Sequence, residues 1–243
     1  MDVASRGYAN PDLLWTPKTL QERQGQSGLT IIDTRPAERF AKGRIPGARH
    51  FDLYFVNTND TDPAPLESLT RMWANMLGWQ GVQDTDTIVF SGEFTDMCVA
   101  RGFWLAEYLD HADVHVLDGG IAARLAAGLA VETGSDAPKP VKFEFKPNAK
   151  TVATYSCVLD AIDDPNCVIV DNRGRDEFVG MNKRTRHGGA IPAFTHFDGC
   201  NRGNAPGAAL PEAPCTDSGC RFIDHITYCY YGINKGNSPT FWI

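Results

Sequence analysis

The stretch GLTIIDTRPAERFAKGRIPGARHFD, residues 28–52, is the part of the chain that decides the predicted fold. It begins with an apolar, β-branched run, continues through Asp-x-Arg and Ile-Pro, and ends in His-Phe-Asp. A related stretch, NCVIVDNRGRDEFVGMNKRTRHGGAIPAFTHFD, occupies residues 166–198 and presents the same features in the same order. Further along, DTIVFSG (86–92) and DHITYCY (224–230) are separated by the same offset as the two Asp-x-Arg motifs. These matches predict two copies of one unit, related by duplication.

Short strands and amphipathic helices alternate within each copy. The β-branched runs TIID, TIVF, VHVL, VIVD and HITY predict strands, whereas LESLTRMWANMLGW and MCVARGFWLAEYLDHA carry apolar residues three and four positions apart. Because this alternation is typical of a parallel sheet covered by helices, we predict an α/β fold with two such domains. The expected boundaries are an N-terminal domain over 1–135, a Pro- and Lys-rich linker over 136–150 and a C-terminal domain over 151–243.

The overall charge of the chain limits its partners. Its 30 acidic and 23 basic residues give a formal net charge of -7, which disfavours broad electrostatic binding to nucleic acid or to anionic lipid. No apolar run approaches the ~20 residues that span a membrane, and the N-terminal sequence lacks the features of a secretory signal. We therefore expect a cytoplasmic protein without nucleic-acid or membrane partners, in which an anionic ligand is attracted by a local basic site. The oligomeric state is not indicated.

The chain contains seven cysteines. Four of them lie singly within or beside apolar segments, as free thiols do in a reducing compartment: Cys98, Cys157, Cys167 and Cys229. The other three lie in an irregular stretch: Cys200, Cys215 and Cys220. Their spacing lacks the paired knuckles of a structural zinc site, so no metal site is predicted there.

Cys229 occupies the place where an anion site is expected in a parallel α/β domain. It ends the predicted strand HITYC and is followed by the loop residues YYGINK. The ends of such strands meet helix N-termini, whose amide groups attract an anion. A loop that wraps over the sulfur lowers the thiol pKa from about 8.5 into the range that reacts at neutral pH. We expect a nucleophilic thiolate at Cys229, a tight turn at Gly232, and the start of a helix within residues 235–243.

Together these motifs resemble the tandem rhodanese family, which includes thiosulfate and 3-mercaptopyruvate sulfurtransferases. The resemblance covers nearly the whole chain and includes Leu-Asp-Gly-Gly at 117–120 and Gly-x-Ile-Pro-Gly-Ala at 43–48. It implies an inactive N-terminal domain, and Ser91 does stand where Cys229 stands in the second copy. The chain ends at Ile243, where the first copy continues through a further helix and strand, so the second domain is expected to be truncated at its C-terminus.

The resemblance also implies a double displacement through a persulfide, without a metal or organic cofactor. Cys229 would take sulfur from a small anionic donor and pass it to cyanide or a thiol acceptor. The single cation of the loop favours thiosulfate over 3-mercaptopyruvate as the donor. The expected donor-binding residues are Arg173, Arg186, Tyr230, Tyr231, Gly232, Ile233, Asn234 and Lys235, with Lys183 and Arg184 as further cationic candidates.

Several of these residues also have a structural explanation. Arg173 is matched by Arg35 in the copy that is expected to be inactive, so an ion pair that ties the fold together explains it equally well. Arg186 and Lys235 either bind an anion or are solvated charges, and the two loop tyrosines either line the donor pocket or cover the neighbouring domain. The matched residues of the two copies are expected to be structural: Asp33, Asp171, His50 and His196.

Two other functions follow from the same residues. A non-catalytic, rhodanese-like binding or scaffold protein is favoured by the truncated second half and disfavoured by the retained Cys229. A cysteine-dependent phosphatase of related fold requires arginine at the seventh position of the loop, where this chain has Lys235. A guanidinium binds phosphate through two parallel hydrogen bonds, and an ammonium group does not. Lysine at this position therefore disfavours the phosphatase.

Overall fold

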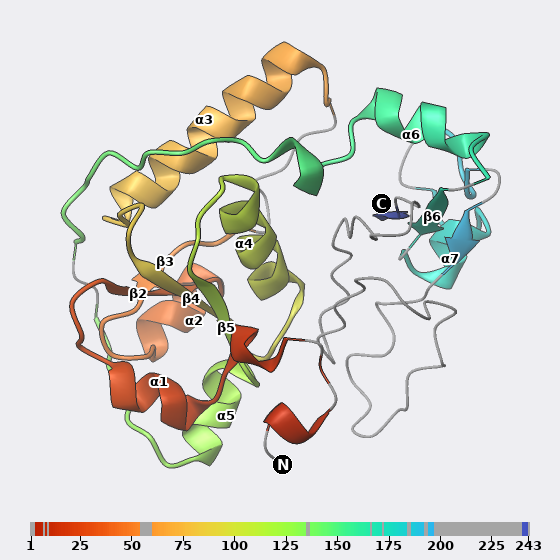
Figure 1. Cartoon of the computed structure of the whole chain (residues 1–243). Coiled ribbons are helices and arrows are strands. Elements are labelled where there is room, and N and C mark those ends of the chain that lie inside the picture. Colours follow the sequence, from red (N-terminus) through yellow and green to blue (C-terminus); the bar gives the residue numbers. More distant parts are fainter. Residues whose placement is uncertain are drawn as a thin grey trace. The chain divides into compact units, whose positions relative to one another are not determined.

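The structure is a computed structural model of the 243-residue chain. It describes residues 3–6, 8, 10–53, 60–134, 137–165, 167–171, 173–183, 186–191, 194–196 and 240–242. The chain divides into two compact units, unit 1 over Met1–Ala149 and unit 2 over Lys150–Ile243. Each unit contains a sheet of its own (Figure 1).

Unit 1 is built on a five-stranded sheet in which all neighbouring strands are parallel. The strand order is β1-β5-β4-β2-β3. The strands are β1 (Leu14–Trp15), β2 (Leu29–Asp33), β3 (Arg49–His50), β4 (Thr87–Ser91) and β5 (Val114–Leu117). Asp33 at the end of β2 lies opposite Ser91 at the end of β4. The carboxyl ends of these two strands therefore meet at one edge of the sheet.

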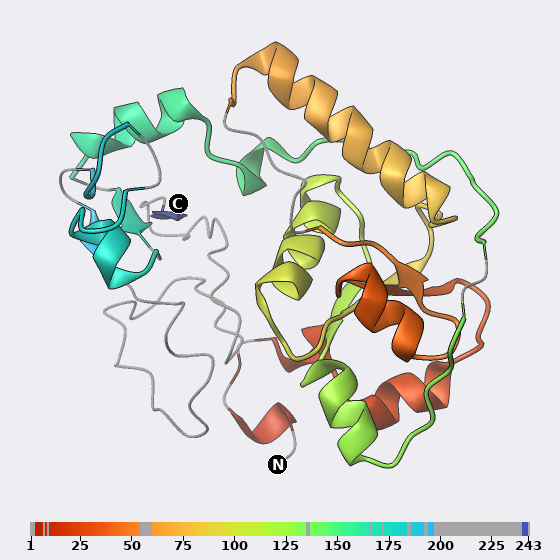
Figure 2. The ribbon, with the colours of Figure 1, turned by 180° about the vertical axis from the view of Figure 1, so that it is seen from behind.

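Helices cover both faces of this sheet. The two ribbon views agree that α3 and α4 lie on one face and that α1, α2 and α5 lie on the other (Figures 1 and 2). The helices are α1 (Pro17–Arg23), α2 (Ala37–Lys42), α3 (Pro63–Trp79), α4 (Met97–Tyr108) and α5 (Gly120–Ala126), preceded by the short 3-10 turns η1 (Val3–Arg6) and η2 (Pro11–Leu13). The prediction of an α/β fold with a parallel sheet flanked by helices is confirmed for unit 1.

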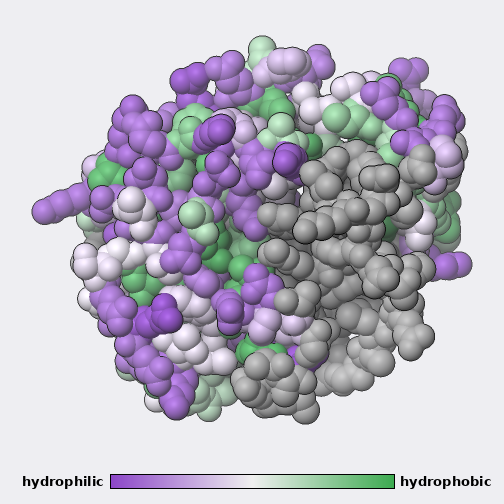
Figure 3. Space-filling view, viewed as in Figure 1, coloured by the Kyte–Doolittle hydropathy of each residue, from purple (hydrophilic) through white to green (hydrophobic). Residues whose placement is uncertain are grey.

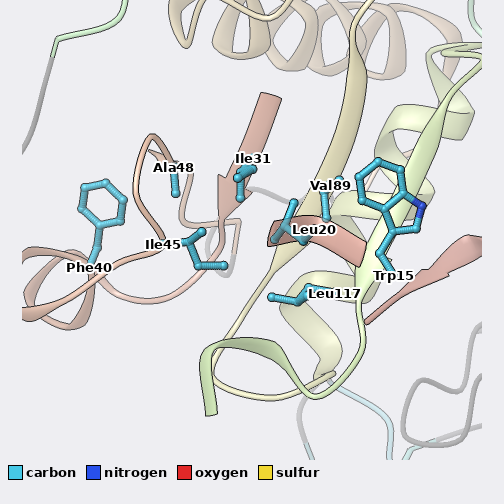
Figure 4. Packing of buried hydrophobic residues seen from close by; sticks show 8 residues of the cluster. All are labelled: Trp15, Leu20, Ile31, Phe40, Ile45, Ala48, Val89 and Leu117. Atoms are coloured by element: carbon cyan, nitrogen blue, oxygen red, sulfur yellow. The ribbon is translucent and has the colours of Figure 1, made fainter. Parts of the chain in front are cut away.

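The core of unit 1 follows from the alternation of side chains along its strands. Ile31, Val89 and Leu117 come from three neighbouring strands and pack with Leu20 of α1 and Phe40 of α2 (Figure 4). Alternate residues of a strand point to opposite faces, so the neighbouring strand residues pack on the α3 and α4 side. Full burial of each such aliphatic or aromatic side chain stabilises the fold by about 1.5–3 kcal/mol.

Gly102 of α4 packs directly against the ring of Phe90 on the second face of the sheet. A Cβ atom at this position would lie 2.4 Å from Cδ1 of the buried Phe90. Alanine favours a helix by about 1 kcal/mol over glycine, but overpacking a core costs about 1–3 kcal/mol. We expect Gly102→Ala to lower the urea midpoint of unfolding, and Phe90→Leu in the same chain to restore part of the loss. A midpoint that is unchanged or raised would contradict this account of the packing.

Most of the predicted linker over 136–150 packs against unit 1. The N–H of Val141 donates to the carbonyl of Gly78 at 2.9 Å, and the N–H of Asn148 donates to that of Tyr108 at 2.7 Å. Phe143 is buried and stacks on His111, with 5.8 Å between the ring centroids. The segment is therefore held by backbone hydrogen bonds and by one buried ring.

Unit 2 repeats part of this arrangement around a smaller parallel sheet, in the order β7-β6-β8. Its elements are α6 (Tyr155–Ile162), β6 (Val168–Asp171), α7 (Arg175–Phe178), β7 (Thr195–His196) and β8 (Thr240–Trp242), and the 3-10 turn η3 (Ala149–Thr151) joins the two units. Asp171 of β6 lies opposite His196 of β7, as Asp33 of β2 lies opposite His50 of β3. The register of the duplicated strands is therefore the same in both units.

A helix was expected to begin within residues 235–243, but the described part of this stretch is a strand. Residues Thr240–Trp242 form β8, in which Phe241 lies opposite Ile169 of β6. Threonine and aromatic residues favour a pleated, half-buried surface, and the proline at 239 disfavours a helical conformation for the residue before it. The predicted strand HITYC at 225–229 lies outside the described residues.

Hydrophilic residues cover most of the face of unit 1 that Figure 3 shows, with small hydrophobic areas between them. Among the described residues, no helix combines the length and the apolar character needed to cross a membrane.

Candidate functional site

Asp33 and Arg35 form a buried ion pair at the end of β2. The Nε–H and the backbone N–H of Arg35 both donate to Asp33 Oδ1, each at 3.0 Å. Nη2 of the arginine also donates to the carbonyl of Gly43 at 2.6 Å. The Asp33 side chain is 1% exposed and that of Arg35 is 7% exposed. Since charges this deeply buried require partners, the pair holds the chain leaving β2 in a fixed conformation.

Asp171 and Arg173 make the same contacts at the end of β6. Nε–H of Arg173 donates to Asp171 Oδ1 at 2.9 Å, and Nη2 donates to the carbonyl of Gly189 at 3.1 Å. Burial acts to raise the pKa of Asp171, but the hydrogen bonds and the charge of Arg173 outweigh it and hold that pKa below its ordinary value. Nε2 of His196 lies 2.9 Å from the carbonyl oxygen of Arg173. His50 contacts Arg35 in the same way, at 2.8 Å, so both copies share one structural motif.

The two arginines differ in how the rest of the guanidinium is occupied. In unit 1, Nη1 of Arg35 lies 3.4 Å from a carboxylate oxygen of Glu93, in the loop after β4. The offset that relates the copies places the uncharged Tyr231 at the position of Glu93. The Arg173 side chain is 37% exposed, and its Nη1 makes no hydrogen bond to another described residue. Both arginines pair with an aspartate, but Arg35 has a second carboxylate within ion-pair distance, and the Arg173 side chain is the more exposed of the two.

The loop after β4 in unit 1 is acidic, and one of its carboxylates caps the helix that follows, α4. Burial raises the pKa of Asp96, which caps α4 by accepting from the N–H of Cys98 and of Val99, and the nearby carboxylates of Asp33 and Glu93 raise it further. Ser91 Oγ is buried without a hydrogen-bond partner among the described residues. Because no described residue is hydrogen-bonded to this hydroxyl as a base, and the loop that follows it carries carboxylates, the serine lacks the environment of a nucleophile that attacks an anion.

The other predicted site residues divide into two groups. Arg186 is exposed, as is Lys183, and both lie on the segment whose end at Gly189 is held by Arg173. The loop that was predicted to carry the chemistry lies outside the described residues, as does Arg184: Cys229, Tyr230, Tyr231, Gly232, Ile233, Asn234 and Lys235. The structure thus brings Arg173 to the base of the segment that carries Arg186.

Two of the described cysteines are unsuited to nucleophilic chemistry. Burial raises the pKa of the Cys98 thiol to about 11, and the charge of Asp96 adds to the shift. Burial also raises the pKa of Cys167 to about 11, and the thiol donates to a carboxylate oxygen of Asp164 at 3.3 Å. The thiolate is the nucleophilic form, so both groups are inert at neutral pH.

Comparison with known proteins assigns part of the chain to a known domain family. Residues 16–127, which include the Asp33 and Arg35 pair and the loop after β4, match the family described as the Rhodanese-like domain. Residues 16–127 of the chain therefore form a rhodanese-like domain. The chain is 28% identical over 184 residues to a protein of Pseudomonas aeruginosa named "Probable 3-mercaptopyruvate sulfurtransferase", and the match covers 69% of this chain and 63% of that relative.

Two further relatives agree with this family. The chain is 24% identical over 191 residues to the thiosulfate sulfurtransferase of Azotobacter vinelandii, which covers 79% of this chain and 70% of that protein. The crystal structure of SseA from Escherichia coli, described as a 3-mercaptopyruvate sulfotransferase, superposes with a TM-score of 0.66 at 23% identity. That match covers 76% of this chain and 74% of SseA, and it supports the fold.

Proposed function

We propose that this protein is a rhodanese-type sulfurtransferase that moves a sulfane sulfur from thiosulfate, through a persulfide on Cys229, to cyanide or a thiol acceptor. The observation that carries the proposal is the difference between the two arginine clamps. The Arg173 side chain is 37% exposed at the end of β6, whereas Arg35 is buried in unit 1 and lies within ion-pair distance of a second carboxylate, that of Glu93. Relatives named as sulfurtransferases, for thiosulfate and for 3-mercaptopyruvate, support the reaction class.

The proposal assigns different roles to the two copies. The N-terminal domain, residues 1–135, is structural because Ser91 replaces the nucleophile and its loop is acidic. The C-terminal domain, residues 151–243, carries the reaction and is joined to the first by residues 136–150. The loop of the second copy contains Lys235 and no acidic residue between it and Cys229, so its charge suits an anionic donor.

The reaction proceeds by two displacements on sulfur. The Cys229 thiolate attacks the outer sulfur of thiosulfate, a new S–S bond forms, and the bond to the inner sulfur breaks as sulfite leaves with the electron pair. Cyanide or a thiolate then attacks the outer sulfur of the persulfide and releases the Cys229 thiolate. Arg173 and Arg186 bind the donor's oxygens, and Lys235 with the loop amides stabilises the charge that develops on the departing sulfite.

The experiment that tests this function is intact-mass measurement of the full chain before and after incubation with thiosulfate. A gain of one sulfur atom is expected in the wild-type protein and none in Cys229→Ser. Addition of cyanide should remove the sulfur and yield thiocyanate. The same measurement with 3-mercaptopyruvate gives the donor preference. No gain with either donor, from protein shown to be folded by circular dichroism, would refute the enzyme and favour a binding or scaffold role.

A further inference from the structure

The second copy carries an insertion that the first copy lacks. Twelve residues separate Phe178 from Ile191, whereas four separate Phe40 from Ile45, and the added sequence contains basic residues but no acidic ones. It forms a loop whose two ends touch, since a Cβ atom on Gly180 would lie 3.0 Å from the backbone nitrogen of Gly189. Positive φ angles of 80° and 91° at these two positions allow the reversal, because glycine adopts them without strain.

The loop is fixed to the site on one side. Its end at Gly189 accepts the hydrogen bond from Arg173 Nη2, and the N–H of Asn182 donates to the carbonyl of Asp176 at 2.9 Å. The aliphatic stem of Lys183 lies against Gly188, since a Cβ there would lie 2.8 Å from Lys183 Cγ. The loop therefore presents its cations from a base that is shared with Arg173.

Exposed apolar side chains lie beside these cations. Met181 is 79% exposed, and Val179 and Ile191, at the two ends of the loop, are exposed as well. Lys183 and Arg186 are exposed between them. We call these five residues the Met181 surface. Methionine and arginine are enriched at protein interfaces relative to the rest of the surface, and the rim of an interface is polar.

The exposure of the Met181 surface favours a protein as its ligand over a small dianion. A small dianion is bound tightly when its cations are enclosed and removed from water, whereas Lys183 is open and makes no ion pair with another described residue. A protein partner covers such cations itself and also buries the apolar residues beside them. In a chain of net charge -7, a local basic surface selects an acidic partner by charge complementarity.

We propose that the Met181 surface docks an acidic protein whose thiol accepts the sulfur from Cys229. The proposal rests on the sulfurtransferase function given above and adds the class of acceptor. In the transfer, the acceptor thiolate attacks the outer sulfur of the persulfide, the Cys229 thiolate leaves with the electron pair, and the partner carries the persulfide away. No further oxidant or reductant is required.

The test follows discharge of the preloaded full chain. Cys229 is loaded with thiosulfate, excess donor is removed, and loss of the sulfur is timed by quenched intact mass. The acceptors are two cysteine peptides that differ only in carrying glutamate or glutamine around the cysteine, with cyanide as a third. The glutamate peptide is expected to react roughly tenfold faster than the glutamine peptide at low ionic strength, since steering of this kind raises association rates by about 10-fold or more. At about 1 M salt the Debye length falls to roughly 3 Å, and the ratio should approach one.

Variants separate docking from chemistry. Lys183→Glu is expected to abolish the preference for the glutamate peptide, and Met181→Ala to slow discharge to both peptides, while both variants, once fully loaded, still discharge their sulfur to cyanide. Lys42→Glu is the matched control, because it makes the same charge change at an exposed position in the first copy. Equal rates for the two peptides, or a preference that survives Lys183→Glu, would overturn the docking surface and leave the sulfurtransferase intact. Failure of the wild-type chain to load sulfur would overturn both.

Discussion

Asp33→Ala is expected to unfold unit 1 or to bring it close to unfolding. The substitution leaves the Arg35 guanidinium buried, with only the longer contact to Glu93 and the carbonyl of Gly43 as partners. Removing one member of a buried ion pair costs about 3–5 kcal/mol, and domains have only about 5–15 kcal/mol in total. Urea unfolding followed by tryptophan fluorescence reports mainly on this unit, because four of the five tryptophans lie in it.

Asp171→Ala provides the matched comparison in the second copy. The side chain of its partner Arg173 is 37% exposed. Water therefore solvates much of the guanidinium charge that loses its carboxylate partner in this variant. A smaller loss of stability is therefore expected for unit 2. The double variant Asp33→Ala, Arg35→Leu should recover part of the loss of the single one, since it removes the buried charge. Equal effects of Asp33→Ala and Asp171→Ala would contradict the role that burial has in this argument.

The regular elements of unit 1 could be predicted because their patterns are long and local. The runs TIID, TIVF and VHVL correspond to β2, β4 and β5, and the apolar periodicity over 66–79 and 97–112 corresponds to α3 and α4. The helix α4 ends at Tyr108, four residues before the pattern does, and α3 begins at Pro63. The residues at which a helix begins and ends depend on capping and on the first turn, which apolar periodicity does not predict.

The contacts that distinguish the copies could not be predicted in the same way. The interaction of Glu93 with Arg35 depends on the register of β2 and β4, which places residues 58 positions apart side by side. The comparison of Glu93 with Tyr231 at the duplicated position was the available signal. The burial of Phe143 within a Pro- and Lys-rich stretch is accompanied by hydrogen bonds to carbonyls of unit 1 at Gly78 and Tyr108, which no pattern within residues 136–150 reveals.

Arg173→Gln is expected to slow loading of Cys229 by thiosulfate by about ten- to a hundredfold. A hydrogen bond to a charged group contributes about 1.5–3 kcal/mol, and the variant removes the guanidinium that is proposed to face the donor. Arg175→Gln is the matched control, because it removes the same charge from an exposed residue two positions away. The measurement is the loading rate by intact mass over a range of thiosulfate concentrations. Equal loading by the two variants would contradict donor binding by Arg173.

The concentration dependence separates donor binding from a structural role of the same arginine. If Arg173 binds the donor, Arg173→Gln requires more thiosulfate for the same rate, and Arg173→Lys, which keeps the charge, recovers part of the affinity. If Arg173 only holds Asp171 and Gly189 in place, both variants lose the two-pronged contact with the carboxylate and load a smaller fraction of the protein at every donor concentration. The Arg173 side chain is 37% exposed, whereas Arg35 is buried and has Glu93 as a second partner, and this difference is the reason to expect the first result.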